Sequence, residues 1–230
     1  MSKFLITPSL YNSFLYYAMT DFNSIWEDPE KAAEAEKNAY QDWLDCLNKV
    51  RKPTTEVQQR GINFENAVYE LTQGIERIEG INAEATAQGV SELPASNLLD
   101  DAEYATAQEI AEKVKGGLWQ EVLTKDVGDY LLYGKSDVIR RDKIFDIKRV
   151  NSYEVGKYQK SIQHSIYMEC AGIEHFEYLI SNGKTVYSEY YHREPNNLDR
   201  LIGKIDNMVN FIAGTPEFFR PFKQNWIARE

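Results

Sequence analysis

The chain has 230 residues, of which 43% are hydrophobic and 13% aromatic, and its formal net charge is −10. A chain of this size can bury a substantial core, and we expect one domain with a mainly helical part at 1–117, a sheet core at 118–193 and a C-terminal helix and tail at 194–230. No apolar run approaches the roughly 20 residues of a membrane helix, and the first ten residues, MSKFLITPSL, lack the layout of a signal peptide. These features exclude a membrane-spanning protein and predict an intracellular one.

The two cysteines, Cys46 and Cys170, lie far apart and show no CxxC spacing. Neither a disulfide framework nor a cysteine-ligated zinc or iron–sulfur site is therefore indicated. We expect two buried free thiols.

The N-terminal half is predicted to be helical. Helices are expected to begin at the Thr-Pro pair 7–8, at the Asp-Pro pair 28–29 and at one of the threonines 54–55, because these residues are typical N-caps and first-turn residues. Residues 80–100 predict a loop, and a short helix after it ends at the glycines 116–117. The third helix shows apolar spacings of three and four, the mark of a packed face, at Val57, Gly61, Phe64, Val68, Leu71 and Ile75.

The hydrophobic period then changes to two, which indicates strands. They are predicted at 118–125, 130–140, 143–150, 175–180 and 185–193. A helix over 153–171 is expected to pack through Val155, Tyr158, Ile162 and Ile166. The last predicted helix ends at Gly214 and carries Leu198, Leu201, Ile205, Met208 and Ile212.

Charged residues interrupt the strands of the central hairpin, GKSDVIRRDKIFDIKR at 134–149. If Arg141 and Asp142 form a two-residue turn, Asp137 lies opposite Asp146, with Cβ atoms about 5 Å apart. Because side chains alternate along a strand, Asp146 and Lys148 share one face. The spacing therefore predicts two carboxylates and an ammonium at one place.

Two facing carboxylates are unfavourable unless a proton or a cation lies between them. Carboxylate oxygens, with water and the Ile147 carbonyl, form a hard-oxygen site that suits Mg²⁺ or Mn²⁺. Such an ion polarises a phosphoryl oxygen and lowers the pKa of a bound water, and Lys148 beside it offsets charge in the transition state. The alternative is a solvated strand face with incidental charges, and these three residues alone leave it open.

The order of elements, with Asp137 on the second strand and Asp146-Ile147-Lys148 on the third, resembles the PD-(D/E)XK nuclease superfamily. The Gln-x-x-x-Tyr sequence at 163–167 resembles a motif of its RecB-like branch, which includes phage exonucleases of the lambda type. The segments GINFE at 61–65 and ITPSL at 6–10 are similar to that branch's helical motif and N-terminal region. The resemblance extends from about Thr7 to about Arg193. It implies an α/β (α+β) fold: a restriction-endonuclease-like core, with a central mixed sheet flanked by helices and an N-terminal helical elaboration.

The resemblance also implies roles. Asp137, Asp146, Glu65 and the Ile147 carbonyl would be metal ligands, Lys148 the catalytic lysine, and Gln163 and Tyr167 residues that steady the site or the DNA backbone. From the residues alone, the alternatives are that Glu65 is an ordinary rim glutamate and that Gln163 and Tyr167 are a polar pair at the core edge. Ser136 stands where the family has proline, and Asp146 where it often has glutamate. The RecB-like branch also includes the Cas4 nucleases, and the cysteine ligands that hold an iron–sulfur cluster in those members have no counterpart in this sequence.

Basic residues gather where the carboxylates lie. From Gly61 to Glu112 there are eleven acidic residues and one basic residue, whereas Lys135 to Lys160 holds eight basic and four acidic residues. A nuclease must hold a polyanion beside its own carboxylates, so cations and stacking aromatics are expected at its border. Solvated charges on a hairpin and a helix are the alternative. The predicted DNA-binding residues are Arg140, Arg141, Lys143, Arg149, Tyr153, Lys157 and Lys160.

Together these features predict a Mg²⁺- or Mn²⁺-dependent DNA nuclease, an exonuclease of phage or prophage type acting in recombination or DNA processing. The alternatives are a structure-specific endonuclease and a non-catalytic DNA-binding or scaffolding protein that retains the fold. The resemblance further implies the cytoplasm of a bacterium or phage-infected cell, a single-strand annealing protein as a partner, and association of the chain with copies of itself.

Overall fold

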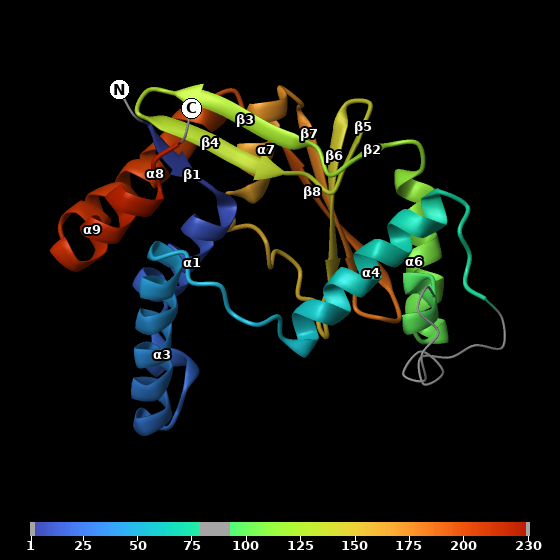
Figure 1. Cartoon of the computed structure of the whole chain (residues 1–230), viewed down its shortest axis with the longest axis horizontal. Coiled ribbons are helices and arrows are strands. Elements are labelled where there is room, and N and C mark those ends of the chain that lie inside the picture. Colours follow the sequence, from blue (N-terminus) through green and yellow to red (C-terminus); the bar gives the residue numbers. More distant parts are fainter. Residues whose placement is uncertain (1–2, 79–92, 229–230) are drawn as a thin grey trace.

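The computed structural model describes residues 3–78 and 93–228. Two mixed sheets are flanked by helices, as Figure 1 shows, so the predicted α/β class is confirmed. The three-stranded sheet has the order β1-β4-β3 and the five-stranded sheet the order β2-β5-β6-β7-β8. The strands are β1 (Phe4–Ile6), β2 (Leu118–Trp119), β3 (Val122–Val127), β4 (Tyr130–Lys135), β5 (Val138–Arg140), β6 (Lys143–Arg149), β7 (His175–Ser181) and β8 (Val186–His192).

The described helices lie on both sides of these sheets and at the N- and C-terminal ends of the chain (Figure 1). In the part of the chain that the structure describes, no helix combines the length and the apolar character needed to cross a bilayer. Residues 79–92 of the predicted 80–100 loop lie outside the described residues. The helices are α1 (Pro8–Met19), α2 (Phe22–Ile25), α3 (Pro29–Leu47), α4 (Glu56–Thr72), the 3₁₀ helix η1 (Ala95–Leu98), α6 (Asp101–Val114), α7 (Gln163–Ala171), α8 (Asn197–Ala213) and α9 (Pro216–Asn225).

The predicted helix starts are confirmed by their caps. The Thr7 hydroxyl accepts from the backbone N–H of Leu10, and the Asp28 carboxylate accepts from the first turn of α3. At the start of α4, Thr55 and Gln58 form a reciprocal capping box. Each cap satisfies backbone donors that a helix cannot satisfy internally.

The prediction that 118–125 and 130–140 each form one continuous strand is wrong. Both segments bend, at positions that lie opposite each other. The Gln120 N–H donates to the Asp137 carbonyl, and the Ser136 N–H donates to the Glu121 carbonyl, both at 3.0 Å. Gln120 takes a positive φ of 58°, a conformation that costs a non-glycine residue energy. The hairpin stays paired through the bend while its two halves join different sheets, so Asp137 lies at the junction.

The predicted helix at 153–171 is also too long. Regular helix begins only at Gln163, and the segment before it forms turns, with Gly156 at a φ of 83°. Val155, expected on the packed face, is 95% exposed, whereas Ile162 and Ile166 are buried as predicted. The consequence is an irregular segment at 151–161, directly after β6.

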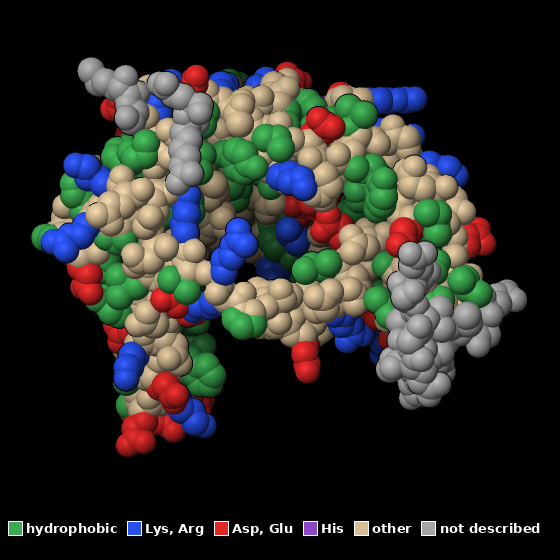
Figure 2. All heavy atoms as spheres, in the orientation of Figure 1, with side chains coloured by type: hydrophobic (Ala, Val, Ile, Leu, Met, Phe, Trp, Pro, Cys, Tyr) green, Lys and Arg blue, Asp and Glu red, His purple; other side chains and the backbone are tan. Residues whose placement is uncertain are grey.

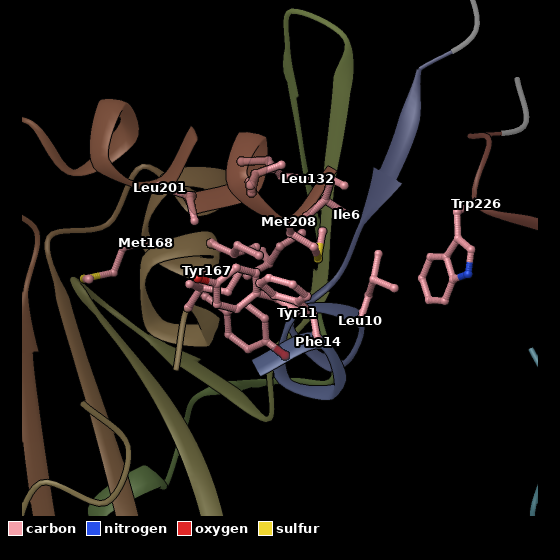
Figure 3. Packing of buried hydrophobic residues seen from close by; sticks show 14 of the residues in the cluster. Ile6, Leu10, Tyr11, Phe14, Leu132, Tyr167, Met168, Leu201, Met208 and Trp226 are labelled. Atoms are coloured by element: carbon pink, nitrogen blue, oxygen red, sulfur yellow. The ribbon is translucent and has the colours of Figure 1, made fainter. Parts of the chain in front are cut away.

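Two hydrophobic clusters cover the sheets. The first joins α1, α3, α7, α8 and α9 to the three-stranded sheet and one face of the five-stranded sheet, and Figure 3 shows part of it. The second joins α4 and α6 to the opposite face of β6, through Phe145 and Ile147. Helix α9 and the buried Trp226 after it were not predicted. Strand β6 is therefore covered on both faces, and residues that alternate along it point to different clusters.

The expected packing of α4 holds only in its middle. Phe64 and Val68 are buried, but Val57 and Ile75 are exposed. A Cβ atom built on Gly61 would have nothing within 4 Å, so the close approach to the sheet expected at this glycine is not seen. The side chains of Phe64, Ala67 and Val68 fix α4 against the second cluster instead.

Candidate active site

The ladder between β5 and β6 has the predicted register. Arg140 pairs with Lys143, Ile139 with Ile144 and Val138 with Phe145, around a turn in which Arg141 takes a φ of 55°. The ladder ends at Val138, one residue before the expected pair of Asp137 with Asp146. Because Asp137 lies at the bend, its Oδ2 instead accepts from the backbone N–H of Ile147 at 2.7 Å.

Asp146 is the most enclosed carboxylate of the site, at 1% exposure. Its Oδ1 accepts from the Gln163 side-chain amide at 2.5 Å, and its Oδ2 lies 2.6 Å from Nζ of Lys148. Asp146 and Lys148 thus share a face, as strand alternation predicted. Gln163 is the first residue of α7, and its side chain reaches Asp146 from this end of the helix.

Tyr167 lies one turn after Gln163 and supports it. Its hydroxyl accepts from the Gln163 amide at 3.3 Å and donates to the Lys135 carbonyl at 2.8 Å. The ring occupies the space above Gly134, where an added Cβ atom would lie 2.2 Å from the ring. A glycine within a strand often marks such a close approach, and this was the available sequence signal for the contact.

Glu65 approaches from α4, on a different element from the aspartates. Its Oε1 accepts from the side-chain amide of Gln120 at 2.5 Å. Burial raises the pKa of Glu65, and the charge of Asp146 raises it further, which indicates that the two carboxylates lie near each other. Sequence reasoning did not identify Gln120, because the bend that turns it toward Glu65 has no local signal.

The carboxylates repel one another electrostatically. Burial raises the pKa of Asp137 well above its usual range, and the charges of Asp146 and Glu65 add to this. Burial also raises the pKa of Asp146, although Lys148 opposes the effect. Burial alone would lower the pKa of Lys148, but Asp146 and Asp137 together raise it. The ammonium is therefore held in its charged form beside three carboxylates.

The donor atoms are of the kind that hard divalent cations bind. Within the described residues, the buried Oδ2 of Asp146 has no hydrogen-bond partner and forms an ion pair with the Lys148 ammonium. No group of three His, Cys, Asp or Glu side chains in that part of the chain converges closely enough to hold an ion. Asp137 accepts a hydrogen bond from Ile147 through Oδ2, and Glu65 accepts one from Gln120 through Oε1.

A pocket of about 310 Å³ adjoins the Gln163 and Tyr167 side of the site. Figure 2 shows that this face of the molecule is hollowed near its centre, between α1 and α4, and that charged side chains of both signs border the hollow. The pocket includes the N-terminal end of α1 and the end of β4, and its polar lining residues are Thr7, Ser9, Asn12, Lys135, Gln163 and Tyr167.

Several of the residues predicted to bind DNA have partners within the protein. Arg140 donates to the Lys113 carbonyl at 2.7 Å, Lys143 forms an ion pair with Glu177 at 2.7 Å, and the Tyr153 hydroxyl donates to Glu189 at 2.8 Å. The remaining predicted cations, Arg149 excepted, are exposed and form no ion pair with described residues: Arg141, Lys157 and Lys160.

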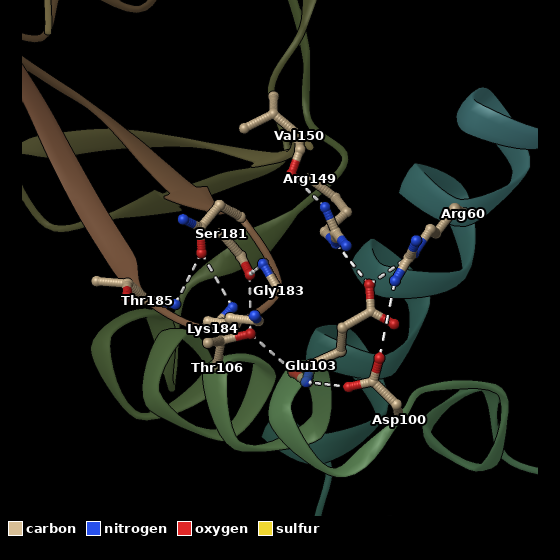
Figure 4. Close-up of polar contacts among 11 residues, drawn as sticks. Arg60, Asp100, Glu103, Thr106, Arg149, Val150, Ser181, Gly183, Lys184 and Thr185 are labelled. Atoms are coloured by element: carbon tan, nitrogen blue, oxygen red, sulfur yellow. Dashed lines mark hydrogen bonds and ion pairs between the residues drawn. The ribbon is translucent and has the colours of Figure 1, made fainter. Parts of the chain in front are cut away.

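Arg149 lies inside the protein. Its side chain is 5% exposed, and its Nε lies 2.5 Å from Oε1 of Glu103, a carboxylate that also accepts from Nε of Arg60 at 2.8 Å (Figure 4). Arg149 thus does not present its charge beside the site. Since Arg60 is on α4 and Arg149 follows Lys148 on β6, Glu103 ties together the two elements that carry Glu65 and Lys148.

No family model matches the sequence, and no curated protein matches it. Among solved structures, the chain is similar to LHK-Exo in complex with dAMP, with a TM-score of 0.47 and 12% identity over 95% of this chain and 90% of that one. It is also similar to the alkaline exonuclease LHK-Exo from Laribacter hongkongensis, with a TM-score of 0.45 and 14% identity over 95% and 88%. A protein from Eubacterium rectale, provisionally described as an exonuclease, has a TM-score of 0.45 and 14% identity over 96% and 82%.

Proposed function

We propose that the protein is a metal-dependent DNA nuclease of the PD-(D/E)XK type that hydrolyses phosphodiester bonds. The observation that carries the proposal is the set of contacts around Asp146, which lies between the ammonium of Lys148 and the amide of Gln163. The charges of Asp146 and Glu65 raise the pKa of Asp137, and the charge of Asp146 raises the pKa of Glu65, so the three carboxylates lie near one another. A purely structural ion pair would not need three carboxylates around one lysine.

Asp137, Asp146, Glu65 and the Ile147 carbonyl are the residues that would hold Mg²⁺ or Mn²⁺. When bound, such an ion polarises a phosphoryl oxygen and lowers the pKa of a coordinated water. Lys148 stays protonated, so it acts by stabilising negative charge that develops on the phosphate and not as a base.

Gln163 and Tyr167 hold the side chain of Asp146 in a fixed orientation. The amide of Gln163 fixes the orientation of the Asp146 carboxylate, and the Tyr167 hydroxyl connects that amide to the backbone of Lys135. Second contacts of this kind hold ligand atoms in a productive geometry. We therefore assign both residues a positioning role.

The surroundings suit a DNA strand. The 310 Å³ pocket beside the site contains the N-terminal end of α1 and Lys135, and helix N-termini and lysines both favour anions such as phosphate. On the other side, Tyr158 lies near enough to Lys148 and Asp146 for their charges to affect its pKa, with Lys157 and Lys160 exposed on the same segment.

Exonuclease action, of phage or prophage type, is proposed over endonuclease action because of the resemblance to the RecB-like branch. An annealing protein as partner and association with copies of the chain are proposals on the same ground. A non-catalytic scaffold would be expected to lack a ligand or the lysine, and this chain retains all of them.

The test compares the wild type with Lys148→Ala on end-labelled linear DNA and on closed circular DNA, each with Mg²⁺, Mn²⁺ or EDTA. The exposed Lys31 on α3 provides the control variant Lys31→Ala. We expect metal-dependent loss of linear DNA only, unchanged in the control and reduced at least about 100-fold in Lys148→Ala. DNA binding without cleavage under every condition would replace the nuclease with a DNA-binding scaffold.

A further inference from the structure

A second pocket, of about 490 Å³, lies on the other side of Glu65. It is formed by the outer face of α4 and by the segment that leads from β2 into the bend. Two aromatic rings form part of its wall, since Tyr69 and Trp119 meet edge to face with centroids 5.1 Å apart. The lining residues are Ile62, Glu65, Asn66, Tyr69, Trp119 and Gln120.

The lining suits a flat, uncharged group with a hydrogen-bonding edge. Ile62 and the two rings are apolar, and Tyr69 is 44% exposed, so ring surface is open to a ligand. The side-chain amide of Asn66 has no hydrogen-bond partner among the described residues. The carboxylate of Glu65 disfavours a phosphate here. A volume of this size accommodates a small organic ligand.

The pocket shares the side chain of Glu65 with the candidate active site. Glu65 lines the pocket and also faces the aspartates, and Gln120, another lining residue, donates to Glu65 at 2.5 Å. Trp119 and Gln120 both line the pocket, and Gln120 takes a φ of 58° at the bend. A ligand in the pocket would therefore be a direct neighbour of a group at the site.

We propose that this pocket binds one unstacked nucleobase of the DNA strand whose phosphodiester lies at Asp137, Asp146 and Lys148. The inference rests on the proposed nuclease function. The base stacks on the ring of Tyr69 or Trp119, and the amides of Asn66 and Gln120 face its polar edge. Stacking on aromatic residues tolerates any base, while amides pair well with adenine edges.

The test uses single-stranded oligonucleotides in which one abasic nucleotide is moved position by position past the scissile bond. Cleavage kinetics are measured for wild type, for Tyr69→Ala and for Asn66→Asp, which adds a charge without removing a packed ring. Tyr16, also exposed, gives the control Tyr16→Ala. Binding of the same oligonucleotides to Lys148→Ala, measured by fluorescence anisotropy, provides a readout that does not need turnover.

We expect one abasic position to weaken wild-type binding and raise KM about 10-fold, and Tyr69→Ala to do the same on the intact strand. The two losses should not add when combined, because both remove the same stacking contact. Additive losses, no sensitive position, or variants that match the wild type would overturn the pocket assignment. If the wild type cleaves DNA in that case, the nuclease proposal stands; if it neither cleaves nor binds DNA, both proposals fail.

Discussion

Removing Glu103 should expose how much the buried ion network contributes to folding. Glu103 is 3% exposed and its Oε1 contacts both Arg149 and Arg60 (Figure 4). In Glu103→Ala, the Arg149 side chain, 5% exposed, loses its carboxylate without gaining water, whereas Arg60, 47% exposed, is readily solvated. The free energy of unfolding should therefore fall by the cost of leaving one buried charge without its partner, about 3–5 kcal/mol.

The loss is measurable because a domain of this size is stable by only about 5–15 kcal/mol. Urea unfolding followed by circular dichroism at neutral pH should give the full difference in the free energy of unfolding. The Tm should fall by roughly 6–20 °C, at about 2–4 °C for each kcal/mol in a domain of this size. The variant should still fold at room temperature.

Two controls separate a buried charge from a general packing defect. Lys52 forms exposed ion pairs with Asp42 and Asp45, so Lys52→Ala should cost less than about 1 kcal/mol. The double variant Glu103→Leu with Arg149→Met removes both buried charges and should be more stable than Glu103→Ala. A loss below about 1 kcal/mol for Glu103→Ala, or a double variant less stable than the single one, would refute the reasoning.

Three further predictions concern the site and the core. The folded-state pKa values of Asp137 and Asp146 are raised above those of the unfolded chain, so their contribution favours folding in full below about pH 4 and is lost as pH rises through the raised values. In EDTA, Asp137→Asn should therefore be more stable than wild type at pH 8, by about 1–3 kcal/mol, and urea unfolding should show the difference shrinking toward pH 5; a constant difference would contradict this. Adding Mg²⁺ should raise the Tm of wild type in a thermal scan but not that of Asp146→Asn, and an equal rise in both would remove Asp146 from the metal site. Phe222 is fully buried and stacks on Phe4 at 4.8 Å, so Phe222→Ala should cost about 3–5 kcal/mol in urea unfolding, and the partly buried Phe219→Ala clearly less; equal losses would contradict the packing.

The sequence by itself determined those features of the fold that depend on neighbouring residues. The starts of α1, α3 and α4 follow from Thr7, Asp28 and Thr55, because a capping side chain satisfies N–H groups two or three residues away. The two-residue turn sets the register of β5 and β6, so the shared face of Asp146 and Lys148 could be read from alternation alone.

The helical spacing of Gln163 and Tyr167 was also predictable, and the structure brings both to Asp146. Their roles, and those of the carboxylates, come from the family resemblance and stay predictions. The position of Asp137 was only half predictable, because its ladder partner was extrapolated one residue beyond the point where the strand bends.

Only the tertiary structure decided where that bend lies, where α7 begins and which charges are buried. Gln120 meets Glu65 across 55 residues, and Arg149 meets Glu103 across 46. Neither contact changes the local pattern of charge or hydrophobicity, so no window of sequence reveals it. Gln120 holds a backbone conformation that its own preferences disfavour, and backbone bonds on both sides of the bend stabilise it. Such conformations and partners depend on the whole packed chain, whereas caps, turns and alternation depend on neighbouring residues alone.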